Sequence, residues 1–105
     1  MATDRIGKLK EMLAKQPNDS FLLHALALEN VKLNDDATAR QLFKQVLANE
    51  PGYVGSYYHL GKLLERTGEI EEAIKVYEEG MKQAKAAKDN HAYNELQAAY
   101  EDVVD

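Results

Sequence analysis

The three histidines are the residues best suited to chemistry in this chain of 105 residues. Imidazole nitrogens bind zinc and transfer protons near neutral pH, so His24, His59 and His91 could form a three-histidine zinc site. No two of them have the four-residue spacing that places a pair of ligands on one face of a helix. A zinc site is therefore the most distant alternative, and histidines that line a binding groove are the simpler interpretation.

The sequence contains no motif of a known catalytic or nucleotide-binding site. It has no glycine-rich phosphate loop, no His-Glu-x-x-His and no nucleophile motif. Carboxylates are plentiful, but the pattern suggests that none stands isolated in an apolar segment, where its pKa would rise towards the range of an acid–base catalyst. We therefore expect that the protein is not an enzyme and that it needs no cofactor.

Composition narrows the class of partner. The net charge of −5 argues against binding to nucleic acid, which requires clustered lysine and arginine. The chain lacks cysteine, so disulfides and thiolate metal sites are excluded. No apolar run is long enough to cross a bilayer and the N-terminus does not resemble a signal peptide, so we expect a cytoplasmic protein without a membrane partner.

An internal repeat predicts the elements that must position the histidines. Residues 20–53 and 54–87 share a pattern with a period of 34 residues. The matched pairs are Pro17 and Pro51, Leu26 and Leu60, Ala27 and Gly61, Ala39 and Ala73, Phe43 and Tyr77, and Leu47 and Met81. A period of this length is typical of stacked helical hairpins, in which small residues let two helices approach and larger ones fill the remaining space.

The recurring residues resemble the tetratricopeptide repeat. The family pattern is a bulky residue, Leu-Gly three positions later, Tyr, and then Ala, an aromatic residue and Pro. The second repeat supplies Tyr57, Leu60, Gly61, Leu64, Ala73 and Tyr77, and the first supplies Leu23, Leu26, Ala27, Ala39, Phe43 and Pro51. Asn30 and Leu64 replace the expected Tyr, and Lys85 replaces a second Pro. The resemblance implies an all-α, right-handed superhelical stack of antiparallel helix hairpins with about six helices, and a scaffold function without catalysis.

We expect a single domain over residues 1–105, with a half-repeat helix at each end. The first is residues 4–15 and the last is a capping helix at residues 90–103, where Gln97 stands in the position of Gly61. Asp19, Gly68 and Asp89 are predicted to begin or end helices. The predicted core is Leu9, Leu23, Leu26, Ala27, Ala39, Phe43, Tyr57, Leu60, Gly61, Ala73, Tyr77 and Leu96.

In the family that the chain resembles, the first helix of each repeat lines a concave groove. The residues outside the motif core at these helices are Phe21, His24, Leu28 and Lys32, then Tyr58, His59, Lys62 and Arg66, then His91, Asn94 and Glu95. Lys62 and Arg66 would form a cationic patch, so a segment with an apolar anchor and a carboxylate would fit. The alternative is that Lys62 and Arg66 pair with Glu65, Glu69 or Glu95.

The sequence bears on two other kinds of partner, a chaperone C-terminus and a second copy of the chain. Some members of this family hold the acidic C-terminus of a chaperone with Lys, Asn and Arg side chains, but the matching positions here carry His24, Leu28, His59, His91 and Glu95. That function is therefore not supported. Self-association as a homodimer is an alternative, because the flank of Ile6, Leu9 and Leu13, with Met12 beside it, has lost the helix that would cover it. The expected partner is thus a protein or peptide.

Overall fold

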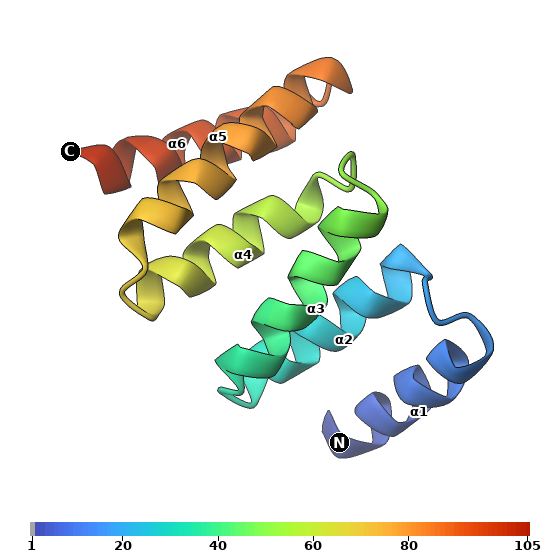
Figure 1. The fold of residues 1–105 in the computed structure, drawn as a ribbon. Coiled ribbons are helices and arrows are strands. Elements are labelled where there is room, and N and C mark those ends of the chain that lie inside the picture. The colour runs from blue at the N-terminus through green and yellow to red at the C-terminus, as the bar shows by residue number, and fades with distance from the viewer. Residues whose placement is uncertain (1) are drawn as a thin grey trace. The chain divides into compact units, whose positions relative to one another are not determined.

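The computed structural model describes residues 2–105, with side chains from residue 4 onward. Its helices are α1 (Ala2–Lys15), α2 (Ser20–Lys32), α3 (Asp36–Asn49), α4 (Gly55–Arg66), α5 (Ile70–Ala86) and α6 (Asn90–Val104) (Figure 1). The described residues contain no strand, so the predicted all-α fold is confirmed. The chain divides after Glu50 into two compact units. That residues 1–105 form a single domain stays a prediction.

The first unit consists of α1, α2 and α3. Its α1 packs on α2 through Leu9, which lies in one buried cluster with Leu22, Ala25 and Leu26. Ile6, Leu13 and Leu42 pack against the same cluster. The prediction that the Ile6–Leu13 flank lacks cover is therefore wrong for its central residue, because Leu9 is only 6% exposed. Met12, which is 51% exposed, is the large apolar residue that α1 leaves open to solvent.

The second unit consists of α4, α5 and α6, with α5 packed against both neighbours. A Cβ atom added at Gly61 of α4 would overlap the ring of Tyr77 in α5. A Cβ atom at Gly80 of α5 would lie 2.6 Å from Cβ of Tyr57 and 3.0 Å from a methyl carbon of Leu96. At Gly80, α5 therefore packs closely against both α4 and α6. All twelve predicted core residues are buried.

Two structural features recur where the helices begin and end. Asp19, Asp35 and Asp89 each accept a hydrogen bond from a backbone N–H in the first turn of the next helix, which stabilises its N-terminus. Asn34 and Gly68 stand 34 residues apart and both adopt positive φ, 61° and 83°. These conformations end α2 and α4 and turn the chain back for the second helix of each hairpin. The predicted roles of Asp19, Gly68 and Asp89 are confirmed.

None of the helices within residues 2–105 combines the length and the apolar character that a membrane span requires.

Candidate partner-binding face

The outer side of α2 is the most apolar surface that the predicted site residues provide. Two further sides of this helix are already buried, since Leu22, Leu23 and Leu26 are all less than 9% exposed. Phe21 is 65% exposed, and Leu28 and His24 are half-buried. His24 lies edge-on to the buried ring of Phe43, with 5.7 Å between ring centroids. Because α2 carries apolar residues on its outer side as well as on its buried sides, it has more hydrophobic surface than its own unit covers.

Lys32, at the end of the same helix, is held by a buried carboxylate. Its Nζ lies 3.1 Å from Oε2 of Glu29, and Nε of Arg5 in α1 donates to the same oxygen at 3.1 Å. The hydrogen bond from Lys32 is the main reason that the pKa of Glu29 falls below its usual value, against the opposing effect of burial. Lys32 is therefore a structural ion-pair partner, less available to a ligand than the sequence suggested.

Glu29 is a buried charged residue that the sequence analysis did not predict. Its side chain is only 5% exposed, so the expectation that no carboxylate stands in an apolar segment is wrong. The apolar residues on both sides of it, Ala27, Leu28 and Val31, were the available signal. Lys32 and Arg5 lower the pKa of Glu29, whereas a carboxyl group that acts as an acid–base catalyst needs a raised pKa.

On α4, the predicted site residues form a row of contacts. The rings of Tyr58 and His59 meet edge-on at 5.6 Å, and Nζ of Lys62 lies 6.0 Å from the centre of the Tyr58 ring. Lys62 also lies 3.6 Å from Oε2 of Glu65, which accepts a hydrogen bond from the hydroxyl of the buried Tyr77. One of the predicted alternative pairings is thus confirmed for Lys62. Arg66 follows at the exposed end of α4.

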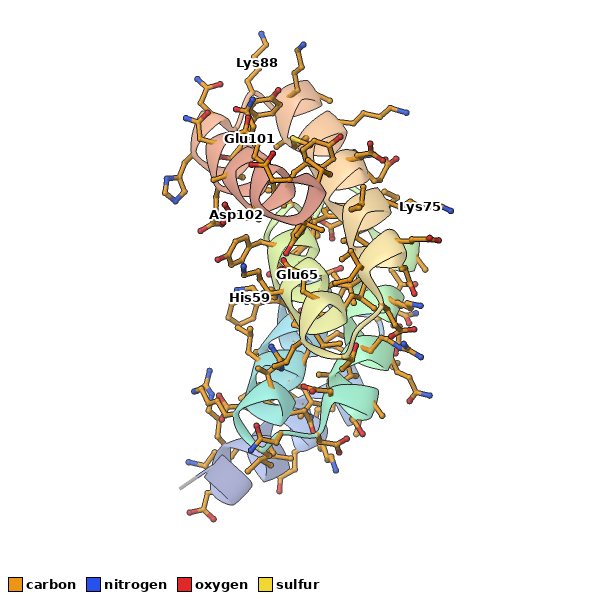
Figure 2. The ribbon with its side chains drawn as sticks, turned by 90° about the vertical axis from the view of Figure 1, so that its left-hand side faces the viewer. His59, Glu65, Lys75, Lys88, Glu101 and Asp102 are labelled. Atoms are coloured by element: carbon orange, nitrogen blue, oxygen red, sulfur yellow. The ribbon has the colours of Figure 1, made fainter. Side chains whose placement is uncertain are left out.

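The second unit brings α6 close to this row. Burial lowers the pKa of His59 below its usual value, and the negative charge of Glu95 in α6 opposes that shift. Figure 2 shows His59 and Asp102 on one side of the molecule and Lys75 of α5 on the other. His91 and Asn94 lie exposed near the start of α6. In the second unit, His59 of α4 and Glu95 of α6 therefore lie close enough to interact electrostatically.

The structure gives no support to a histidine metal site. His24 belongs to the first unit, and His59 and His91 belong to the second. Among the described residues, no three His, Cys, Asp or Glu side chains come close enough together to hold a metal ion.

Comparison with known proteins identifies the repeat. A family model described as "Tetratricopeptide repeat" matches residues 32–100. A tetratricopeptide repeat domain protein from Salinibacter ruber, solved by NMR in solution, shares 38% sequence identity with a TM-score of 0.79; the match covers 83% of this chain and 88% of that one. No curated protein matches the chain.

Two more distant structures share the fold. The TPR2B domain of yeast Sti1, in complex with pHsp70, has a TM-score of 0.88 at 15% identity, over 94% of this chain and 79% of that one. A protein from Bordetella parapertussis has a TM-score of 0.81 at 23% identity, over 94% and 86%.

Proposed function

Because the chain belongs to the tetratricopeptide repeat family, we propose that it binds a protein or peptide segment through the first helices of its repeats. The proposed contact residues in the first unit are Phe21, His24 and Leu28, with Lys32 at the edge. Those in the second unit are Tyr58, His59, Lys62, Arg66, His91, Asn94 and Glu95. Members of this family bind proteins or peptides as scaffolds, and no residue here is assigned a catalytic role.

The observation that carries the proposal is the exposure of Phe21. An aromatic side chain that is 65% exposed gives up much of the free energy that burial would provide, roughly 1.5–3 kcal/mol for a side chain of this size. Phe21 lies on the same helix side as Leu28, two turns further along, and His24 lies between them. An apolar anchor of the partner would cover this row, and such buried aromatic contacts supply most of the affinity in protein interfaces.

On the second-unit face, charge would orient a bound segment and contribute little to its affinity. A carboxylate of the partner can compete with Glu65 for Lys62, because their atoms lie 3.6 Å apart and Lys62 is 42% exposed. Such surface ion pairs contribute only about 0–1 kcal/mol, so charge sets direction and the apolar anchor sets affinity. The complex of the yeast Sti1 domain is an example of a partner bound by this fold, although the clamp residues for chaperone tails are absent here.

Capture of the partner with matched variants tests the proposal. Affinity capture from host cells, followed by mass spectrometry, would compare the wild type with Phe21→Asp and with Ile70→Asp. Ile70 is 42% exposed at the start of α5, so the second variant makes the same kind of change on a second helix. Phe21→Asp should lose the partner while Ile70→Asp retains it. Equal capture by both variants would contradict the proposal.

A further inference from the structure

We propose that a groove between α5 and α6 binds one amphipathic α-helix of a partner protein, which runs parallel to α5 and carries carboxylates in its C-terminal half. The inference goes beyond the proposed function, because it concerns a different set of residues from the first-helix face.

The groove consists of two adjoining hollows of about 500 and 480 Å³, which share Lys85 and Tyr93. The half-buried side chains of Met81, Tyr93 and Tyr100 provide its apolar surface. Its polar lining consists of Glu78, Lys82, Gln97 and Glu101 in the first hollow and of Lys88 and Asn90 in the second. An open groove with an apolar base and a charged rim suits a helix better than a small molecule.

The internal repeat explains why the groove exists. On α4, Tyr57, Gly61 and Leu64 are buried, and α5 covers this side of the helix. Their counterparts 36 residues later are Tyr93, Gln97 and Tyr100, all of which line the groove. The groove is therefore the position at which a second helix would pack on α6, as α5 packs on α4.

The charges along the groove give the occupant a direction. Glu78 and Glu101 lie at one end, where the hydroxyl of Tyr100 is 3.5 Å from Oε2 of Glu78. Lys85 and Lys88 lie at the other end, where α5 finishes and α6 begins. A helix has a positive N-terminus and a negative C-terminus, each worth about 0.3–1 kcal/mol beside a suitable charge. The favoured occupant therefore starts at the two glutamates and ends at the two lysines.

This direction agrees with the repeat. α5 runs from Glu78 towards Lys85, so the occupant is parallel to α5 and antiparallel to α6. The second helix of a hairpin has the same relation to its first helix, as α5 has to α4 (Figure 1). Carboxylates in the C-terminal half of the occupant would meet Lys82, Lys85 and Lys88, none of which forms an ion pair within the described residues.

Gln97 argues for a different protein over a second copy of this chain. The residue at its position in α4 is Gly61, whose missing Cβ makes room for the ring of Tyr77. The second-helix patterns in this chain carry Leu9, Phe43 or Tyr77 at the facing position, and each of these bulky residues would meet the side chain of Gln97. The occupant should instead present Ala or Gly to Gln97, with larger apolar residues one turn to either side, facing Tyr93 and Tyr100.

The proposal can be tested with two designed peptides of about 16 residues, long enough to form a helix when stabilised. Both have a Leu/Ala stripe with a central Ala, and their C-terminal halves carry Glu in one and Lys in the other. Fluorescence anisotropy would measure their affinity for the wild type, for Lys85→Glu with Lys88→Glu, and for Lys75→Glu. Lys75 is an exposed lysine on α5 that does not line the groove, so the last variant is the control (Figure 2).

The wild type should bind the Glu peptide, and the double variant should bind it at least about tenfold more weakly. Lys75→Glu should change the affinity less than about twofold. A spin label at the N-terminus of the peptide should broaden the NMR signals of Glu101 and leave those of Lys88 sharp. The proposal would be overturned by equal binding of the Lys peptide, by undiminished binding to the double variant, by no saturable binding of either peptide, or by broadening at Lys88. Light scattering that showed a dimer dissociated by Met81→Glu would also overturn it, because the occupant would then be a second copy.

Discussion

The ring of Tyr77 occupies the space in which a Cβ atom at Gly61 would lie. This contact makes the helix crossing of α4 and α5 depend on the absence of one side chain. An Ala in place of Gly usually stabilises a helix interior by about 1 kcal/mol. At Gly61 an added methyl group would overlap a buried aromatic ring, so the same substitution should destabilise the fold.

We therefore expect Gly61→Ala to lower the free energy of unfolding and Gly61→Leu to lower it further, by about 1–3 kcal/mol. The matched control is Gly7→Ala, because a Cβ atom at Gly7 in α1 meets nothing within 4 Å. That change should stabilise the protein slightly. Urea denaturation followed by circular dichroism measures all three, and an unchanged midpoint for Gly61→Leu would contradict the register of the repeat.

The ion pair between Arg5 and Glu29 should make the attachment of α1 sensitive to acid. Lys32, and to a smaller extent Arg5, lower the pKa of Glu29 in the folded protein. The ion pairs with Glu29 therefore stabilise the fold above its usual pKa of 4.5, and this stabilisation is lost as the pH falls through the lower folded value. Arg5→Ala should lower the melting temperature at pH 7, and the difference from the wild type should shrink below pH 4.5. A difference that stayed constant down to pH 3 would exclude this electrostatic cause.

His59 should also make the fold less stable as the pH falls, but over a higher pH range than Glu29 does. Burial lowers its pKa below the usual value of 6.5, so the unfolded chain takes up a proton before the folded protein does. Stability should therefore fall as the pH drops below 6.5, and His59→Gln should reduce that fall. NMR titration would measure the pKa directly. Glu95→Gln should lower it further, because Glu95 is the charge that favours the protonated ring; a rise on that substitution would contradict the proximity of α4 and α6.

The last helix should be essential for the second unit. Leu96 is 1% exposed and lies against Gly80, so removal of residues 90–105 would uncover the apolar side of α5. The shortened protein should aggregate or bind a hydrophobic dye. A truncated protein that remained soluble with an unchanged melting midpoint would show that α6 is not a cap.

The motif spacing predicted the core because each of its positions is fixed by close packing within one hairpin. Ala27, Gly61, Phe43 and Tyr77 could be identified from their 34-residue period alone. Gly80 was missed, although a glycine inside a helix is costly enough to indicate a close contact. The structure gives the reason, because a Cβ atom at Gly80 would come too close to Tyr57 and Leu96.

The candidate site was less predictable because it depends on contacts between helices. The sequence identified Phe21 and Lys62 as surface residues of first helices, and the structure agrees with their exposure. It could not reveal that Arg5 reaches Glu29, since the two residues are 24 positions apart and no motif relates them. It also treated Gln97 only as a sign of an end cap, whereas the structure shows a groove beside it.

The most direct test of the central proposal is an NMR map of the partner segment on the isotope-labelled protein, once capture has identified that segment. We predict that the largest chemical-shift changes fall on the amides of Phe21, His24 and Leu28 in α2 and of Tyr58 and His59 in α4. Changes confined to α3, to the first half of α5 or to the exposed side of α1 around Met12 would contradict binding by the first helices.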